Sequence, residues 1–504
     1  MDQFFMGIDS GTQGTKVILL NREKKKIETE AQAPHRIIEN NEGRKEQDPA
    51  WWIEATSKSI KYVISKSNIN PTQIKAIGIS GQQHGFVPLD KNGDVIRPAK
   101  LWNDTETAEQ AKKLTEKLGG RKRVINLIGN SIAAGYTASK ILWLKENEPE
   151  NYQKMATIML PHDYLNFWLT GEKKMEFGDA SGTAYFDVKT RKWSPEILIA
   201  IDEGGKLIDC LPELIPAHQP VGTVKKDIAE SFGFNANVLV ASGGGDNMMA
   251  AIGTGNVAQG VVTTSLGTSG TIFCASEKPV VDPKGELAAF CSSDGQWLPL
   301  VCTMNVTVST ELNRNLFGMD VEKLNKIILS SSPGAQGLLI LPYYGGERTP
   351  ALPNACATIY GINNINYKQE NICRAAMEGP TFGLRYGLDI FKANGIGPNE
   401  IRLVGGGAKS KIWRKIVAEI FACPVVCPVT QEAAALGAAL QAFWCYVNSN
   451  EQKTRLKDIT DQYVTLDEAT RVIPNRESIE MYADIYKKYL KLDKLMRPMF
   501  TQSE

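Results

Sequence analysis

The chain has 504 residues, and one hydrophobic core rarely extends beyond about 250 to 300, so at least two domains are expected. Its formal net charge of +1 gives no electrostatic reason to bind nucleic acid or an anionic membrane. Neither a secretory leader nor a membrane-spanning stretch is recognised, and the nine cysteines lack metal-ligand spacing. We therefore expect a cytoplasmic protein with free thiols that binds neither nucleic acid nor membrane.

The first predicted element is a β-hairpin, with strands over residues 4–8 and 17–20 and the turn Gly-Thr-Gln-Gly-Thr at residues 11–15. The same Gly-Thr-x-Gly-Thr pattern returns at residues 267–271, between apolar runs over 261–266 and 271–275. Glycines allow a tight turn that brings backbone N–H groups to an anion, and threonines add hydroxyl donors. Two such hairpins, one in each half, predict a duplicated fold that holds a polyphosphate.

Two charged side chains flank the first turn. Asp9 ends the first strand, and a carboxylate beside bound phosphates is repelled unless a divalent cation lies between them. This favours a magnesium ligand, the alternative being an Asp that caps its own turn. Lys16 either contacts a phosphate or faces solvent, and the spacing excludes a Walker-type loop.

A helix is predicted from about residue 51, with Asp48 as N-cap and Pro49 at the first helical position. The strand that follows, residues 77–80, leads into a polar cluster that contains Gln83 and His84. Ligands of open α/β sheets gather beyond the carboxyl ends of strands, and amide and imidazole groups suit sugar hydroxyls. Trp102, beside polar residues, adds an aromatic face that a sugar pocket could use.

A second short strand, residues 238–241, leads into Gly-Gly-Gly-Asp-Asn at residues 243–247. The glycines would present Asp246 on a closely approaching backbone, where a carboxylate could orient a substrate hydroxyl and accept its proton. Asn247 offers both donor and acceptor groups to a sugar. An ordinary glycine-rich turn is the alternative interpretation of this segment.

In the second half, a strand over residues 401–404 is followed by Gly405-Gly406-Gly407 and an amphipathic helix. Ser410 stands where a dinucleotide fingerprint needs its last glycine, so a nicotinamide enzyme is poorly supported. Small residues over 433–439 predict a helix suited to close packing on a sheet or beside a flat ligand, and residues 482–490 predict an amphipathic closing helix. We expect two lobes, residues 1–256 and residues 257–504.

Together these loops resemble those of the FGGY family of carbohydrate kinases, whose α/β fold is the duplicated, two-lobed actin-like ATPase fold, related to ribonuclease H. Residues 8–12 and 265–270 match the two phosphate loops, and residues 404–408 resemble the adenosine-binding loop. Both family signature stretches are recognisable, at residues 135–147 and 357–378. The resemblance covers about residues 5–490.

The resemblance implies ATP-dependent phosphoryl transfer to a sugar, with magnesium–ATP held in the cleft between the lobes. The motifs at residues 82–85, 101–104, 179–183, 243–247 and 346–350 are most similar to family members that convert D-xylulose to D-xylulose 5-phosphate. Ribulose, gluconate or glycerol as substrate, and a non-catalytic nucleotide switch, are the alternatives. Gln83 and Thr105-Glu106 depart from the pattern common in bacterial relatives, which affects the choice of sugar. A homodimer is compatible with the sequence.

The resemblance also assigns roles to residues. Asp246 is expected to be the catalytic base, and Asp9 the second catalytic carboxylate and the magnesium ligand. Sugar contacts are expected from Gln83, His84, Trp102, Asp246 and Asn247. Nucleotide contacts are expected from Gly11, Thr12, Gln13, Lys16, Gly267, Thr268, Gly405, Gly406, Gly407 and Ala408.

Overall fold

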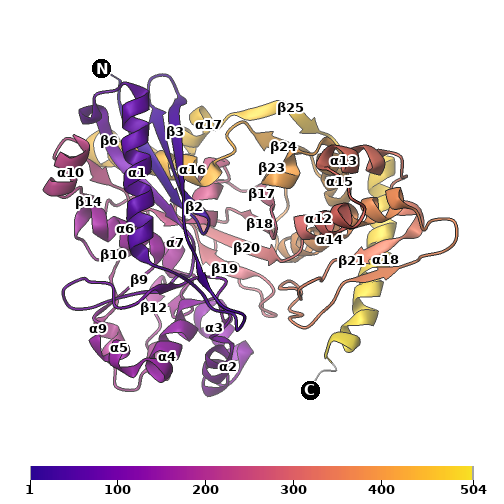
Figure 1. The fold of residues 1–504 in the computed structure, drawn as a ribbon, viewed down its shortest axis with the longest axis horizontal. Coiled ribbons are helices and arrows are strands. Elements are labelled where there is room, and N and C mark those ends of the chain that lie inside the picture. Colours follow the sequence, from indigo (N-terminus) through magenta and orange to yellow (C-terminus); the bar gives the residue numbers. More distant parts are fainter. Residues whose placement is uncertain (1, 502–504) are drawn as a thin grey trace. The chain divides into compact units, whose positions relative to one another are not determined.

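The computed structural model describes residues 2–501 and consists of two compact units (Figure 1). Unit 1 comprises the chain up to Val257 together with Ala275–Pro299 and Glu432–Val464. Unit 2 comprises Ala258–Cys274, Leu300–Gln431 and the chain from Thr465 onward. The units therefore differ from the expected single boundary at residue 256, because two later segments fold with unit 1. Each unit contains a mixed sheet flanked by helices, as the duplicated α/β interpretation predicts.

The sheet of unit 1 follows the order β14-β15-β6-β1-β2-β3, and β16 also pairs with β6. Strand β1 runs antiparallel to β2 and parallel to β6, while β15 and β16 are parallel to β6. The carboxyl ends of β1, β6 and β16 therefore lie at one edge. The strands are β1 (Phe4–Ser10), β2 (Gly14–Asn21), β3 (Lys26–Pro34), β6 (Ile74–Gly81), β14 (Gly222–Thr223), β15 (Leu239–Val240) and β16 (Gly244–Gly245).

Helices cover both faces of this sheet because its central strands are apolar on both sides. Helix α1 (Pro49–Ser67) packs on β2 and β3 and buries Trp52, and Figure 1 shows it lying along these strands. Its N-cap is Asp48, whose carboxylate accepts a hydrogen bond from the backbone N–H of Ala50, as predicted. The other face packs on α11 (Asp246–Gly253) and α16 (Ala433–Asn450).

Glycines allow α16 to lie very close to the sheet. A Cβ atom added at Gly7 or Gly78 would come within 2.0 Å of the carbonyl oxygens of Ala435 and Ala438. The predicted helix of small residues is thus confirmed, in the role of close packing against a sheet.

The rest of unit 1 is mainly short helices, and those over residues 108–154 and 195–209 surround a separate apolar core. The helices are α2 (Ala108–Lys117), α3 (Arg121–Ile128), α4 (Thr137–Asn147), α5 (Pro149–Lys154), α6 (Pro161–Thr170), α7 (Phe177–Ala180), α8 (Pro195–Ile201), α9 (Lys206–Asp209), α10 (Lys226–Phe232) and α17 (Leu456–Tyr463), with η1 (Pro71–Gln73). The minor strands are β4 (Ile38–Glu39), β5 (Lys45–Gln47), β7 (Val87–Leu89), β8 (Ala99–Lys100), β9 (Thr157–Met159), β10 (Lys174–Glu176), β11 (Phe186–Asp187), β12 (Lys192–Trp193), β13 (Glu213–Ile215) and β19 (Ala288–Cys291).

In unit 2 the strands follow the order β20-β18-β17-β23-β24-β25, and β17 runs antiparallel to β18 and parallel to β23. They are β17 (Val261–Leu266), β18 (Gly270–Cys274), β20 (Trp297–Thr303), β23 (Glu400–Val404), β24 (Val425–Pro428) and β25 (Leu466–Val472), with β21 (Leu339–Leu341) and β22 (Thr358–Tyr360) as a separate pair. The helices are α12 (Thr307–Leu316), α13 (Val321–Leu329), α14 (Gln369–Ala393), α15 (Lys411–Phe421) and α18 (Arg476–Thr501), with η2 (Ala335–Gly337) and η3 (Gly406–Lys409).

Several further expectations can be compared with the structure. All nine cysteines are free, as predicted. The amphipathic helix near the C-terminus is confirmed as α18, which buries Tyr482, Tyr486 and Tyr489. Among the helices within residues 2–501, none is both long enough and apolar enough to cross a bilayer.

Candidate active site

The first predicted phosphate loop is the turn between β1 and β2 in unit 1. The backbone N–H of Gly11 donates to the carbonyl of Gly14 at 3.1 Å and closes the turn. Asp9 lies at the end of β1, paired in register with Lys16 on one side and with Ser80 of β6 on the other. The strand pairing thus places a carboxylate, an ammonium and a hydroxyl next to the loop.

The neighbours of Asp9 orient its carboxylate and affect its pKa. The hydroxyl of Ser80 donates to its Oδ1 at 2.7 Å. Burial raises the pKa of Asp9 to about 6, although the Ser80 hydrogen bond and the Lys16 charge act in the opposite direction. Lys16 itself forms an ion pair with Glu432, the residue before α16, so its ammonium has a protein partner in this structure.

Asp246 is the first residue of α11, directly after β16. Its Oδ1 accepts hydrogen bonds from the backbone N–H of Asn247 at 2.8 Å and from the Asn247 side chain at 2.9 Å. The same Asn247 amide donates to Oε1 of Gln83 at 2.8 Å. Three of the predicted sugar-binding residues therefore form one hydrogen-bonded group, and Asp246 and Asn247 remain partly exposed.

Gln83 is almost fully buried, yet its Nε2 has no hydrogen-bond partner among residues 2–501. Buried donors are nearly always paired, so an unpaired amide nitrogen beside a partly exposed carboxylate indicates a place for a polar ligand.

The three glycines before Asp246 are required by close packing. A Cβ atom at Gly243 would lie 2.6 Å from the carbonyl oxygen of Ile79, and one at Gly244 would lie 2.2 Å from Oγ of Ser293. At Gly245 it would lie 2.6 Å from Cγ of Gln83. The backbone that leads to Asp246 therefore fits only because residues 243–245 are glycines, which have no Cβ atom.

The electrostatics of Asp246 suit a base that works near neutral pH. Burial and the negative charges of Asp9 and Asp179 raise its pKa to about 7, against the lowering effect of the Asn247 hydrogen bonds. A carboxylate with such a pKa accepts a proton more readily than an ordinary aspartate does.

Next to Gly243, the first of these three glycines, lies a buried charged group that the sequence patterns did not predict. His162 is fully buried, with Nδ1 2.7 Å from Oδ2 of Asp179 and Nε2 3.0 Å from Oδ1 of Asp163. Burial alone would lower the pKa of His162, but the two carboxylates raise it well above its usual value. Burial also raises the pKa of neighbouring Glu176, to about 7. Only the resemblance of residues 179–183 to a family motif pointed to this region.

Thr12, in the first loop, belongs to a chain of hydrogen bonds. Its hydroxyl donates to Gln82 at 2.9 Å and accepts from the indole N–H of Trp102 at 3.0 Å. Gln82 donates in turn to Gln47, which donates to the carbonyl of Thr12 at 2.8 Å. Trp102 thus contacts the predicted phosphate loop, and Gln13 at the tip of that loop is exposed.

A second residue missed by the sequence interpretation is His35, which follows β3. Its Nδ1 lies 3.0 Å from the carbonyl oxygen of Gly11 and its Nε2 lies 2.9 Å from the hydroxyl of Thr15. Burial lowers the pKa of His35, so the neutral ring donates to Gly11 and accepts from Thr15. A histidine twenty residues after the turn carries no local signal of this contact, because the pairing of β2 with β3 creates it.

His84 is buried and adopts a left-handed backbone with φ of 62°. Its ring centroid lies 4.4 Å from that of Tyr136 and 5.7 Å from that of Phe290. It directly follows Gln83, so the structure places it next to the group around Asp246.

In unit 2, the second hairpin and the glycine loop after β23 lie together. Ser265 of β17 pairs with Val404, and a Cβ atom at Gly405 would lie 2.8 Å from the backbone of Leu266, just before Gly267. Gly405, Gly406 and Thr268 are exposed, whereas Gly407 and Ala408 are buried. The predicted nucleotide loops of this unit therefore lie side by side.

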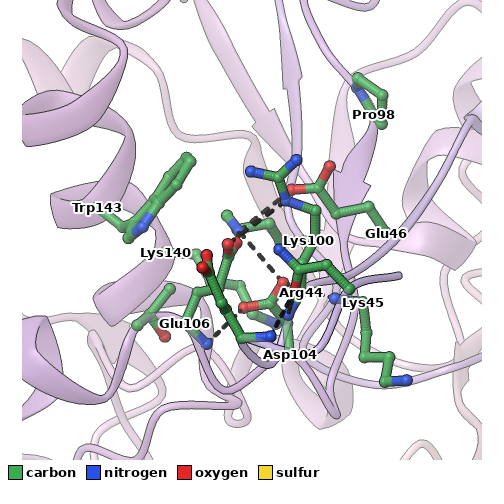
Figure 2. A network of polar contacts seen from close by, with 12 residues as sticks. Arg44, Lys45, Glu46, Pro98, Lys100, Asp104, Glu106, Lys140 and Trp143 are labelled. Atoms are coloured by element: carbon green, nitrogen blue, oxygen red, sulfur yellow. Dashed lines mark hydrogen bonds and ion pairs between the residues drawn. The ribbon is translucent and has the colours of Figure 1, made fainter. Parts of the chain in front are cut away.

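One cluster of three carboxylates has metal-like spacing among the described residues: Glu46, Asp104 and Glu106. Figure 2 shows the ammonium of Lys100 among them. Its Nζ lies 3.1 Å from Glu46 and 3.1 Å from Asp104, and it also contacts Glu106. The ammonium of Lys100 supplies the positive charge at this cluster, and Glu106 forms an ion pair with it.

The fold and its loops place the chain in a class of proteins, the two-lobed α/β proteins of the actin-like ATPase type. The N-terminal domain of the FGGY family of carbohydrate kinases matches residues 4–253, and the C-terminal domain of that family matches residues 262–446. The chain belongs to the FGGY family of carbohydrate kinases.

Individual relatives agree with this assignment. A xylulose kinase of Haemophilus influenzae is 46% identical over 490 residues, which cover 96% of this chain and 98% of that protein. The solved xylulose kinase of Bifidobacterium adolescentis is 33% identical, with a TM-score of 0.81, and covers 96% of this chain and 99% of its own. A solved structure from Brucella ovis, described as a xyloylose kinase, is 28% identical with a TM-score of 0.91 and covers 99% and 100% of the two chains.

Proposed function

We propose that the protein is an ATP-dependent xylulose kinase that transfers the γ-phosphoryl group to D-xylulose and forms D-xylulose 5-phosphate. The 46% identity to a xylulose kinase supports the choice of sugar. The hydrogen-bonded group of Asp246, Asn247 and Gln83 supports the chemistry, because a base of raised pKa lies beside a buried amide nitrogen, Nε2 of Gln83, that has no partner within residues 2–501.

In this mechanism the sugar hydroxyls bind to Gln83, His84 and Asn247, with Trp102 bordering the pocket. Asp246 orients the attacking hydroxyl and accepts its proton at Oδ1 or Oδ2. The Asn247 hydrogen bonds hold the Asp246 carboxylate in one orientation throughout the transfer.

The nucleotide is proposed to bind to the glycine-threonine loops. The backbone N–H groups of Thr12 and Gln13 in unit 1 and of Thr268 in unit 2 are the proposed phosphate donors. Gly11 and Gly267 form the turns that present them, since their own N–H groups donate to Gly14 and Ser269. Gly405–Ala408 is the proposed adenosine site. Lys16 would contact a phosphate after exchanging its ion pair with Glu432.

Magnesium fits this donor set. A lone carboxylate at the end of β1 matches an ion that keeps most of its waters and binds phosphate oxygens, so Asp9 would hold it. The bound ion would neutralise charge on the phosphate oxygens. A homodimer and a cytoplasmic location stay predictions.

An assay of ADP release over a panel of ketoses and polyols tests the proposed function. We expect D-xylulose to give the highest kcat/KM, with ribulose, gluconate and glycerol lower by about 10-fold or more. A higher kcat/KM for one of the others would assign that substrate instead. An absence of sugar-dependent ADP release with every compound would contradict the kinase mechanism itself.

The role of His35 gives a separate prediction. His35→Ala leaves the Gly11 carbonyl and the Thr15 hydroxyl without this partner, so we expect the KM for ATP to rise about 5- to 10-fold while the KM for the sugar stays within about twofold. His218→Ala removes an exposed imidazole and should leave both values unchanged. Steady-state kinetics measure both, and an unaltered KM for ATP in His35→Ala would exclude the role.

A further inference from the structure

The segment that carries Gln83 and His84 is held at three points. The backbone N–H of Gln82 donates to the carbonyl of Ser10 at 3.0 Å, and that of Phe86 donates to the carbonyl of Lys100 at 2.9 Å. Between these two, the carbonyl oxygen of His84 accepts a hydrogen bond from Nζ of Lys140 at 2.6 Å. The middle contact is made by a side chain and can be removed by substitution.

Lys140 lies one turn into α4, and the start of this helix surrounds His84. The Lys140 side chain is fully buried. The hydroxyl of Thr137 also donates to the His84 carbonyl, at 3.3 Å, and the ring of Tyr136 packs on the imidazole. On the other side, a Cβ atom at Gly182 would lie 2.5 Å from the imidazole. The ring is therefore fixed between α4 and the backbone of residue 182.

The two buried lysines of this region have different partners. Figure 2 shows Lys140 next to the Lys100 cluster, in which Glu46, Asp104 and Glu106 surround Lys100. Lys140 has no ion pair among the described residues, and its partner is a neutral carbonyl. Burial and the Lys100 charge lower its pKa well below the usual value, although Asp104 opposes this. An amine donates a hydrogen bond to a carbonyl whether it is charged or neutral.

A strained backbone explains why this donor matters. A non-glycine residue with φ of 62° is held there only when the surroundings favour it. A buried carbonyl that loses its main donor favours a rotation of the peptide, and such a rotation would carry the imidazole away from Tyr136.

We propose that Lys140 is a positioning residue for the sugar pocket, which fixes the left-handed backbone of His84 through the His84 carbonyl and thereby aims the imidazole at the sugar. The proposal rests on the proposed sugar-kinase function, since it assumes that His84 contacts the sugar. It assigns Lys140 no direct contact with either substrate.

The first test is kinetic, with Lys140→Met, which keeps the length of the side chain and removes the donor. The KM for the sugar is expected to rise about 10- to 100-fold, with the KM for ATP within about twofold and kcat within about fivefold. Lys145→Met on the same helix, whose ammonium binds Asp202 at 2.6 Å, is the matched control and should be unchanged. An unaltered sugar KM, or equal increases for sugar and ATP, would overturn the proposal.

A double substitution separates positioning from a general loss of structure. If Lys140 acts through His84, Lys140→Met combined with His84→Ala should give the same sugar KM as His84→Ala alone. Additive effects would overturn the proposal. Should Lys140→Met fail to fold, Thr137→Val removes the second donor and is expected to raise the sugar KM about two- to fivefold. No change in that variant would equally overturn it.

A spectroscopic measurement does not depend on the activity. The chain has four histidines, so imidazole resonances in histidine-labelled protein can be assigned by substitution. Lys140→Met should shift the His84 resonance, because the ring leaves Tyr136, and leave those of His35 and His218 in place. An unshifted His84 signal would refute the proposal. Absence of sugar turnover in the unsubstituted protein would instead contradict the proposed function.

Discussion

Asp246→Asn is expected to lower kcat about 10³-fold while the dissociation constant for the sugar stays within about threefold. The substitution keeps the size of the side chain and can keep the hydrogen bond from the backbone N–H of Asn247 to Oδ1. It removes the only feature that proton transfer needs, a group that can accept the proton of the attacking hydroxyl. Steady-state assays measure kcat, and calorimetric titration with sugar measures the dissociation constant.

The pH dependence identifies the same carboxyl group. Because the pKa of Asp246 is raised to about 7, the base is protonated below this pH and ionised above it. The kcat/KM of the unsubstituted enzyme should therefore rise with pH through about 7 and then level off. The residual activity of Asp246→Asn should lack this acid limb.

The pH dependence of the folding stability provides a control for Asp246→Asn. Between pH 3.8, the ordinary pKa of Asp246, and about 7, the folded protein keeps a proton that the unfolded chain has lost. Stability due to this group therefore falls as pH rises through that window and is lowest above it. Asp246→Asn should be at least as stable as the unsubstituted protein in thermal denaturation at pH 8, so unfolding would not explain the lost activity.

A second aspartate of raised pKa serves as the matched comparison. Burial also raises the pKa of Asp294, which accepts hydrogen bonds from Gln296 in a turn of unit 1. Asp294→Asn should change kcat by less than about threefold. Near-normal turnover in Asp246→Asn, or an equal loss in Asp294→Asn, would remove Asp246 from the role of base.

Local patterns predicted the parts of the fold that local chemistry determines. Both glycine-threonine turns lie between the strands that the apolar runs indicated, and Asp48 caps α1. The glycines before Asp246 indicated a close approach of the backbone, and the added-Cβ distances confirm one. Each of these features depends on neighbours in sequence, so a single sequence is enough to recognise it.

Contacts between distant segments were not predictable in this way. The pairing of Lys16 with Glu432 and the inclusion of residues 432–464 in unit 1 join opposite ends of the chain. The ion pairs of His162 depend on how α6 packs against β6, and the hydrogen bond from Lys140 to His84 depends on where the start of α4 meets the segment after β6. Isolated histidines and lysines look alike in a sequence, whether they are buried partners or solvated surface groups.

Asp9→Asn is expected to lower kcat about 10²- to 10³-fold and to raise the magnesium concentration needed for half-maximal activity. The asparagine can still accept the Ser80 hydrogen bond at Oδ1, so the turn should keep its geometry. What it loses is the charge that would hold a divalent cation near the phosphates. Assays over a range of magnesium concentrations at fixed ATP measure both quantities.

Loss of the Asp9 charge also changes the pKa of Asp246, which can be measured separately. The negative charge of Asp9 raises the pKa of Asp246, so its removal should lower that pKa and move the acid limb of kcat/KM to lower pH. Ser80→Ala removes the hydrogen bond but keeps the charge, and should reduce kcat less than about 10-fold with an unaltered magnesium requirement. If Ser80→Ala were as damaging as Asp9→Asn, the contribution of Asp9 would be to the structure of the turn. If Asp9→Asn left the magnesium requirement and the acid limb in place, the cation would have to bind elsewhere.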